Sequence, residues 1–220
     1  FGSATADLPG GVLRADAIGK SINARDAENN PIVTSIGGTA NAQIDDTITV
    51  QGPTSWTGAI PVTLSLHVDG DLLGLAGASA SISLQMQSNA GTSQEFVSAT
   101  WDGEFARLQA DGNGAATVPN GIAPVLLVPI GDPVHHANTG DGVEIGFDVS
   151  VTTLVDPTDP TAAIEAILGV LADPDGALFV GENEADFAET AQLGRTLPEG
   201  FSFTSGSGLL LDATTVPEPS

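Results

Sequence analysis

Apolar and polar residues alternate along much of the chain with a period of two, which is typical of a β-strand that buries one face. The alternation is clearest in four stretches, residues 44–50, 62–69, 78–87 and 143–152. Each stretch predicts a core strand, and residues 143–151, the longest run, predict a central one. In this pattern His67 lies on a polar face, and the serines and glutamines from Ser79 to Gln87 form a flat polar ladder.

Turn residues divide the remaining segments. Asp102-Gly103 separates two strand-like runs, 96–101 and 104–109, and predicts an antiparallel hairpin because both residues tolerate positive φ. Residues 122–130 are nearly all apolar but contain two prolines, which indicates an edge or bulged strand. The polar stretch 23–31 is typical of a loop. Shorter runs, 178–180, 186–193, 201–204 and 209–212, complete the predicted strands.

One segment has a helical pattern. Asp159 is suited to be the N-cap and Pro160 to stand in the first turn, and the apolar residues that follow share one helical face. These residues are Ile164, Ile167, Leu168 and Leu171. We therefore expect a short helix over 160–172 that covers one end of the core.

Short strands, turn-marked spacing and one helix predict an all-β protein, an antiparallel β-sandwich of jelly-roll kind, with a β-barrel as the alternative. The 41% hydrophobic content suffices for one core, so residues 1–215 are expected to form a single domain. No cysteine is present, so stability must come from the core without disulfides. No apolar run reaches the length of a membrane span, and no signal region precedes Phe1-Gly2-Ser3, so the chain is expected to be soluble.

The charge of the chain limits its partners. Lys and Arg number 5 against 28 Asp and Glu, a formal net charge of −23. Such a chain repels phosphate backbones and anionic membranes, which excludes nucleic acid. The acidity favours solubility or adaptation to salt; the alternative is bridging by divalent cations between copies or to acidic polysaccharide.

Several acidic turns have the oxygen-rich composition that calcium prefers. They are Asp69-Gly70-Asp71, the turn with Asp156 and Asp159, and the turn with Asp173 and Asp175. None contains the full calcium-loop pattern, and the alternative is that these side chains only serve the turn backbone. His135-His136, with Asn138 and Asp141, is interpreted as a surface loop in preference to a zinc or copper site, because neighbouring side chains on an extended chain point to opposite sides.

Catalytic signatures are missing from the sequence: it has no G-x-S-x-G, Walker loop, dinucleotide fingerprint or H-E-x-x-H. We therefore expect no enzyme and no cofactor other than calcium. A carbohydrate-binding module is the alternative function, with Trp56 and Trp101 as stacking platforms beside the Ser79 to Gln87 face. Packing in the core or in a loop explains the two tryptophans equally well.

The C-terminal region carries a specific pattern. The order is A-D-F-x-x-T-A from Ala185, P-E-G-x-S-F-T-S-x-S-G from Pro198, and finally Val216, Pro217, Glu218, Pro219 and Ser220. This order resembles the ectodomain end of bacterial PEP-CTERM proteins, exported substrates of the exosortase sorting system. The resemblance implies export from a bacterium to the cell surface or extracellular matrix, with the sorting machinery as a partner. It also implies a transmembrane helix and a basic cluster after the motif. Both are missing here, and we expect either a truncated chain or a processed product, with processing favoured because the sequence has no starting Met and no tag.

The N-terminal segment 1–8 is rich in small residues and uninterrupted by proline. Phe1, Ala4, Ala6 and Leu8 are candidates for a strand that adds to the open edge of another copy, with residues 122–130 as the weak edge. Such head-to-tail addition does not close on itself and builds filaments. The alternative is that this segment pairs within its own sandwich. The sequence thus predicts an exported, non-enzymatic structural protein, a homo-polymer in which exopolysaccharide is a further candidate partner.

Overall fold

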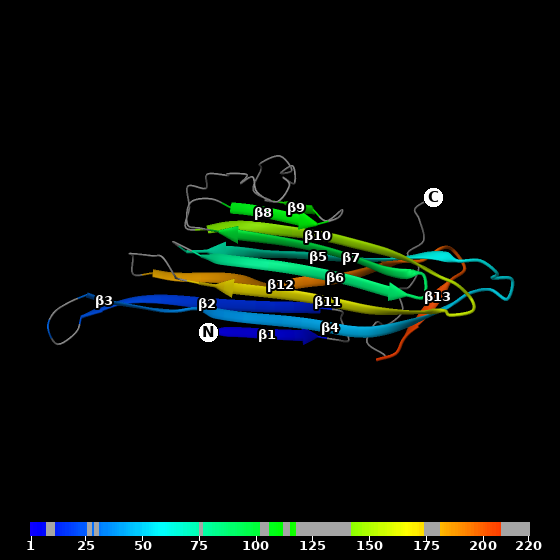
Figure 1. Ribbon diagram of the computed structural model, residues 1–220, viewed down its shortest axis with the longest axis horizontal. Helices are drawn as coiled ribbons and strands as arrows, with labels where there is room; N and C mark the ends of the chain where they lie inside the picture. The colour runs from blue at the N-terminus through cyan, green and yellow to red at the C-terminus, as the bar shows by residue number, and fades with distance from the viewer. Residues whose placement is uncertain are drawn as a thin grey trace.

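Two antiparallel sheets face each other in the structure, a computed structural model that describes residues 1–7, 12–25, 28, 31–74, 77–101, 106–111, 115–117, 142–173 and 181–207 (Figure 1). The seven-stranded sheet has the order β1 (Gly2–Asp7), β2 (Val12–Arg25), β12 (Gly181–Thr196), β5 (Ile60–Leu73), β10 (Gly142–Val155), β9 (Ala115–Thr117), with β3 (Pro31–Ile36) also paired to β2. The six-stranded sheet has the order β13 (Ser202–Ser205), β4 (Gly38–Gln51), β11 (Thr161–Ala172), β6 (Ala78–Ser88), β7 (Gly91–Trp101), β8 (Ala106–Asp111).

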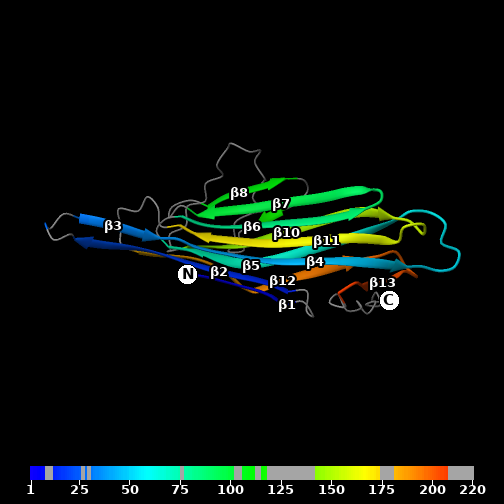
Figure 2. The same cartoon turned by 60° about the horizontal axis from the view of Figure 1, so that its bottom comes forward.

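The strand pairs are nested across the two sheets. β4 pairs with β11. β5, which follows β4 in the chain, and β10, which precedes β11, pair with each other in the opposite sheet. The β4–β5 and β10–β11 connections therefore lie at the same end of the molecule, as expected for a jelly roll. Figure 2 shows β8, β7, β6, β11 and β4 in that order across the six-stranded sheet. The antiparallel β-sandwich predicted from the sequence is confirmed.

A single hydrophobic core fills the space between the sheets. Burial alternates along the strands, as in β4, where every second side chain from Gly38 to Val50 faces inward. The largest fully buried side chains include Trp101, Phe147 and Phe187, and the two phenylalanine rings stack with centroids 5.8 Å apart. Each large apolar side chain removed from water contributes about 1.5–3 kcal/mol.

The predicted helix over 160–172 is wrong, because this segment is strand β11, paired with β4 on one side and β6 on the other. Its buried positions are Ala162, Ile164, Ala166, Leu168, Val170 and Ala172. Three of them are alanines, so the period of two is weak in the sequence. Ile167 and Leu171 point outward instead, and counting them as core residues produced the helical pattern. Asp159 forms an isolated bridge with Asp156, so the Asp-Pro pair belongs to a tight turn.

The other predictions of strands and loops had mixed outcomes. The hairpin is confirmed, since β7 and β8 pair antiparallel from Phe96 to Trp101. The strand over 143–151 exists as part of β10, but it lies beside the short strand β9 and is not central. The loop at 23–31 is shorter than predicted, because β2 extends to Arg25 and β3 begins at Pro31. Residues 122–130, 178–180 and 209–212 lie outside the described residues.

The N-terminal segment pairs within its own chain. β1 lies antiparallel to β2, with Ala4 opposite Ala15 and Ala6 opposite Leu13. The Phe1 ammonium group donates a hydrogen bond to the Ile18 carbonyl at 2.6 Å, and the Ile18 amide donates one to the Phe1 carbonyl at 2.6 Å. In the isolated chain, therefore, the alternative interpretation of this segment holds. Leu8 is outside the described residues.

Close packing of β1 on β4 requires glycine at two positions. A Cβ atom at Gly38 would overlap the carbonyl oxygens of Phe1 and Ile18, and one at Gly2 would overlap the Thr39 carbonyl.

We expect Gly38→Val to lower the free energy of unfolding by about 1–3 kcal/mol, because the backbone must move to admit the side chain. Urea unfolding measures this change. Gly58→Val is the control, since no atom lies within 4 Å of a Cβ there; equal stabilities of the two variants would contradict the close approach.

Candidate functional site

Polar side chains form continuous rows across the outer face of the six-stranded sheet. Asp45 of β4 lies opposite Glu165 of β11, Glu165 lies opposite Gln85 of β6, and Gln85 lies opposite Gln94 of β7. The side chains of these four residues point outward, because burial alternates along each strand and each of the four lies between inward-facing positions. The pairing of four strands thus aligns two carboxylates and two amides in one row.

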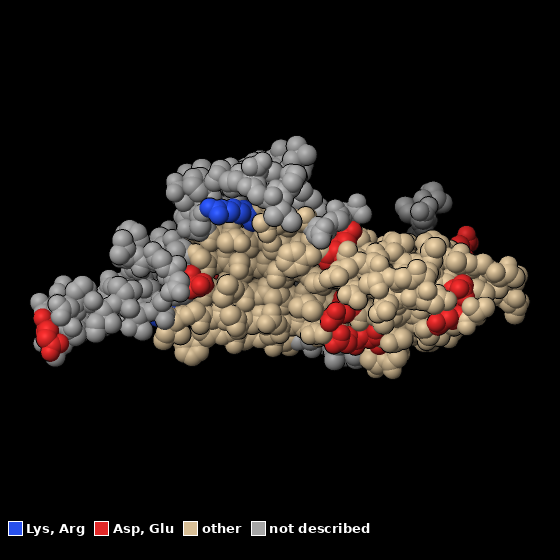
Figure 3. All heavy atoms as spheres, viewed as in Figure 1, with Lys and Arg blue, Asp and Glu red and all other residues tan. Residues whose placement is uncertain are grey.

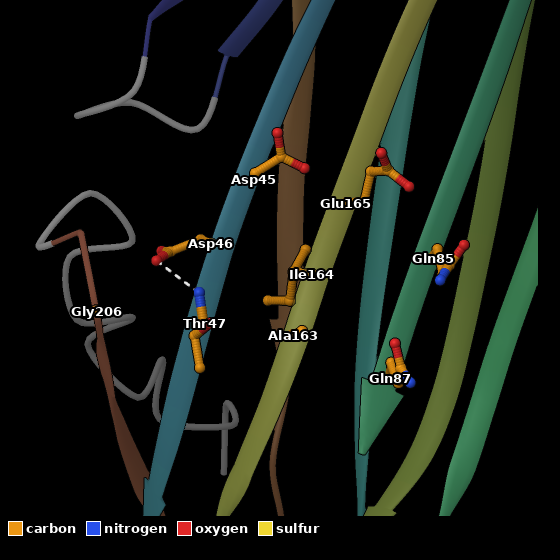
Figure 4. Close-up of a pocket in the computed structure, with 9 residues that line it drawn as sticks. All are labelled: Asp45, Asp46, Thr47, Gln85, Gln87, Ala163, Ile164, Glu165 and Gly206. Carbon is orange, nitrogen blue, oxygen red and sulfur yellow. Dashed lines mark hydrogen bonds between the residues drawn. The ribbon is translucent and has the colours of Figure 1, made fainter.

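A hollow of about 590 Å³ lies over this face. Figure 4 shows its lining, in which Asp45, Glu165, Gln85 and Gln87 present polar groups from three neighbouring strands. In Figure 3 one group of acidic atoms lies over β4 and β11 and others lie elsewhere on this face, while most of the described surface is neither acidic nor basic. The hollow therefore combines a carboxylate group on one side with uncharged amides on the other.

The two carboxylates of the row share one amide. Gln43 Nε2 donates to Asp45 Oδ2 at 2.9 Å and to Glu165 Oε1 at 3.1 Å. Like charges directly opposite each other on neighbouring strands destabilise a sheet, and a neutral amide removes only part of their repulsion. The arrangement is thus complementary to a positively charged or strongly hydrogen-bonding ligand.

Asp46 points the other way and connects β4 to the C-terminal region, as Figure 4 shows. Its carboxylate accepts hydrogen bonds from the Ser205 hydroxyl, from the Ser207 amide at 3.0 Å and from the Thr47 amide at 2.7 Å. Burial by itself would raise the pKa of Asp46, but these hydrogen bonds outweigh it and lower the pKa below the usual value. The Gly206 amide also donates to the Thr47 carbonyl at 2.7 Å. We call this set of contacts the Asp46 lock.

The two tryptophans predicted as stacking platforms do not meet on the polar face. Trp101 is fully buried, and its Nε1 donates to the Gly74 carbonyl at 2.8 Å, so its assignment as a platform is wrong. Trp101 lies at every second position with Val97 and Ala99, and all three side chains point into the core. Trp56 lies in the β4–β5 connection, edge-on to the Phe201 ring with centroids 5.2 Å apart. It is partly buried against the core.

An exposed aromatic ring does lie on the polar face. Phe96 of β7 is 40% exposed and lies directly opposite Ser83 of β6, inside the Ser79 to Gln87 ladder. Ser83 in turn lies opposite Ile167 of β11. The sequence contains the signal that identifies Phe96, because Phe96 and the buried Val97 are adjacent in the strand and point to opposite faces.

The predicted calcium turns are not joined in the structure. Asp69-Gly70-Asp71 lies within strand β5 and is not a turn; it borders a hollow of about 120 Å³ with Glu144 and Asp186. Asp156 and Asp173 flank opposite ends of β11, a strand about 40 Å long. Asp175 lies outside the described residues, as do His135, His136, Asn138 and Asp141. Among the residues described, no group of three or more His, Cys, Asp or Glu has the geometry to hold a metal ion.

The Asp156 carboxylate serves its own turn. Its Oδ1 accepts from the Thr158 amide at 2.8 Å and the Asp159 amide at 3.2 Å, and its Oδ2 accepts from Asn89 Nδ2 at 3.1 Å. Hydrogen bonds from Thr158 and Asn89 lower the pKa of Asp156 to about 2. Asp159 Oδ1 accepts from the Thr161 hydroxyl at 2.6 Å. These contacts fit the alternative interpretation, in which the acids support the backbone of the turn.

His67 joins two strands on the outer face of the seven-stranded sheet. Its Nδ1 lies 2.7 Å from Asp148 Oδ1 and its Nε2 lies 2.9 Å from Asp69 Oδ2, with all three side chains about half exposed. The hydrogen bond to Asp148 raises the pKa of His67, aided by the charges of both carboxylates and opposed by partial burial. His67 is thus on the polar face, as the sequence predicts, and its contacts are between neighbouring strands.

The raised pKa of His67 predicts a pH-dependent contribution to stability. The contribution is fully present below the unfolded pKa of about 6.5 and is lost as the pH rises through the higher folded pKa. Because the groups are exposed, we expect His67→Gln to cost at most about 1 kcal/mol at pH 5.5 and less at pH 9. Urea unfolding of both proteins at the two pH values measures the difference; a cost that does not change with pH would contradict the ion pairs.

Comparison with known proteins adds no relative to these observations. A scan against protein-family models and searches of curated proteins and of solved structures find no match to this chain. Among the described residues, no helix has the length and hydropathy needed to cross a membrane. The residues themselves and the C-terminal resemblance are therefore the basis on which a function can be proposed.

Proposed function

We propose that this protein is an exported, non-enzymatic structural component of a bacterial cell surface or extracellular matrix. The observation that carries the proposal is that two segments of the C-terminal resemblance are parts of the sandwich. The A-D-F segment lies in β12, with Ala185 and Phe187 in the core, and the S-F-T-S segment forms β13. The PEP-CTERM resemblance implies a folded body to which these segments belong and a sorting motif that follows it in the sequence.

The Asp46 lock supports the same proposal. It attaches Ser205 and Ser207 to a residue about 160 positions earlier in the chain, immediately before the segment that leads to the motif. A pulling force on the C-terminus would be transmitted into β4, a strand paired with β11 over twelve positions. Such an attachment suits a body that is held at the cell surface by its C-terminal end.

The shifted pKa values among the described residues have structural causes. The groups with a shifted pKa are Asp46, His67 and Asp156, and each shift arises from hydrogen bonds that connect strands or stabilise a turn. Catalytic acids and bases usually have shifted pKa values inside a cleft. Incubating the protein with panels of polysaccharides and esters tests this part of the proposal. Turnover that disappears on substitution of a single Asp or Glu would contradict it.

Assembly into filaments by strand addition is a further part of the proposal. In the single chain β1 covers the edge of β2, so donation requires β1 to leave β2 and pair with another copy. The β10 edge is partly occupied, because Glu95 Oε2 accepts from the Ser150 amide at 3.1 Å and the Ser88 hydroxyl donates to the Leu154 carbonyl at 2.8 Å. Light scattering on the full chain and on a deletion of residues 1–8 tests assembly; filaments from the deleted chain would exclude β1 as donor.

Glycan binding is the second candidate function, and the exposed Phe96 on the polar face favours it. Flat rows of amide and hydroxyl groups around an exposed ring are suited to a sugar, which has polar hydroxyls at its edge and apolar C–H groups on its face. Exopolysaccharide of the matrix is the candidate ligand.

Calcium remains a candidate ligand of either function. A chelator that leaves the melting temperature unchanged at low salt would exclude a structural calcium site, because a ligand of the folded state must raise it.

A further inference from the structure

We propose that the outer face of β4, β11, β6 and β7 binds a glycan that carries free amino groups, with Phe96 as its stacking platform and Asp45 and Glu165 as its ammonium site. This inference rests on the second candidate function and specifies its ligand.

Phe96 supplies the apolar surface. Its ring is 40% exposed on the outer face of β7, where an outward-facing strand position normally carries a polar residue. Ile167 lies two strands away in the same row, with Ser83 between them. An aromatic ring and an aliphatic side chain on either side of a serine form a flat surface on which the C–H face of a pyranose ring can pack.

The neighbouring row supplies hydrogen bonds of both kinds. Gln85 and Gln94 lie opposite each other, and Gln94 Nε2 donates to the Ser83 hydroxyl at 3.3 Å. Each primary amide offers two donors and one acceptor oxygen, which matches adjacent sugar hydroxyls that both donate and accept. Gln85 lies on β6, between the strand of Phe96 and the strand of Glu165, so a glycan that crosses from one to the other passes over it.

The carboxylates determine the charge of the ligand. Asp45 and Glu165 lie opposite each other and have Gln43 Nε2 as a shared neutral donor. A uronic acid at this place would face two carboxylates of the same sign within a protein of net charge −23. An ammonium group on the sugar ring would instead be attracted by both and could donate three hydrogen bonds to them. Charge complementarity therefore favours a 2-amino-2-deoxy sugar over neutral and acidic ones.

The spacing of the two subsites fits a short oligosaccharide. Phe96 and Glu165 are two strands apart and one row out of line, which corresponds to roughly 10 Å across the sheet and about 7 Å along it. The 590 Å³ hollow extends over the acidic end of this path. Two or three linked pyranose rings can therefore place one ring on Phe96 and an amino group between Asp45 and Glu165.

Calorimetric titration of the full chain with three probes tests the inference: a hexamer of β-1,4-linked glucosamine, the same hexamer fully N-acetylated, and a hexamer of galacturonic acid. We expect the glucosamine hexamer to bind, the N-acetylated hexamer to bind at least tenfold more weakly, and the uronate not to bind. Phe96→Ala should weaken binding of the glucosamine hexamer about tenfold. Glu165→Gln should weaken it about fivefold and reduce its dependence on salt.

Two matched variants control for general effects. Leu154→Ala shortens another exposed apolar side chain, 48% exposed on a strand of the opposite sheet, and Glu144→Gln removes one charge from that sheet. Neither should change the affinity. If Glu144→Gln weakens binding as much as Glu165→Gln, the attraction comes from the net charge and the inference is wrong.

Two other outcomes separate this inference from the function on which it rests. Equal binding of the glucosamine and N-acetylated hexamers, lost in Phe96→Ala, would overturn the ammonium site and leave glycan binding by this face in place. Binding of none of the three probes would overturn the amino-sugar inference; a screen of neutral polysaccharides by affinity electrophoresis then decides on glycan binding itself.

Discussion

Replacing Trp101 with alanine is expected to lower the free energy of unfolding by about 3–5 kcal/mol, the largest effect of any substitution considered for this protein. The indole is fully buried at the end of β7, and its removal leaves a cavity and removes the hydrogen bond to the Gly74 carbonyl. Chemical denaturation followed by circular dichroism measures the loss.

Trp56→Ala serves as the matched control for Trp101→Ala. Trp56 is only partly buried, packs edge-on against Phe201, and donates to the Gly58 carbonyl at 2.5 Å within its own loop. Its removal should cost less than half as much. If the Trp56 variant is destabilised as strongly as the Trp101 variant, the assignment of Trp101 to the core and of Trp56 to its margin is wrong.

Loss of the Asp46 lock is expected to have the second largest effect. Asp46→Ala removes a partly buried carboxylate that accepts hydrogen bonds from Ser205, Ser207 and Thr47, and it should lower the free energy of unfolding by about 2–3 kcal/mol at pH 7. Asp45→Ala is the control, because Asp45 is the adjacent residue in β4 and its carboxylate faces solvent opposite Glu165. That substitution removes a like-charge contact and should change stability little.

The stabilisation by Asp46 should depend on pH in a defined direction. Because the folded pKa of Asp46 is lowered, its contribution is present above the unfolded pKa of about 3.9 and is lost as the pH falls through the folded pKa. The difference in unfolding free energy between the native chain and Asp46→Ala should therefore narrow below about pH 4. A difference that stays constant from pH 7 to pH 2 would show that the ionised carboxylate is not the stabilising species.

The strands that the sequence predicted correctly are those with large apolar residues at every second position. From Val62 to Val68 in β5 and from Val143 to Val151 in β10 the inward positions are occupied by Val, Leu, Ile and Phe, so the period of two is unambiguous. In β11 three of the six inward positions are alanines, and outward Ile167 and Leu171 produced a false helical face. Alanine fits a tightly packed inward position, but its small side chain gives little indication of burial in a sequence.

The candidate site could be predicted only in part. The phase of β6 placed the Ser79 to Gln87 ladder on an outer face, and the same argument applied to β7 would have assigned Trp101 to the core and Phe96 to the surface. The pairing of Asp45 with Glu165 depends on the register between two strands distant in sequence. The Asp46 lock likewise joins segments whose proximity follows only from the complete fold.

The location of the protein in the cells that produce it tests the central proposal most directly. Fractionation into cytoplasm, membrane and extracellular matrix, followed by detection with an antibody against the sandwich, measures it. The proposal predicts that the chain is found at the cell surface or in the matrix, and that substituting Pro217 and Glu218 with alanine in the full-length protein retains it at an earlier stage of export. A chain found in the cytoplasm, or a distribution unchanged by the substitutions, would contradict the proposed role of the C-terminal motif.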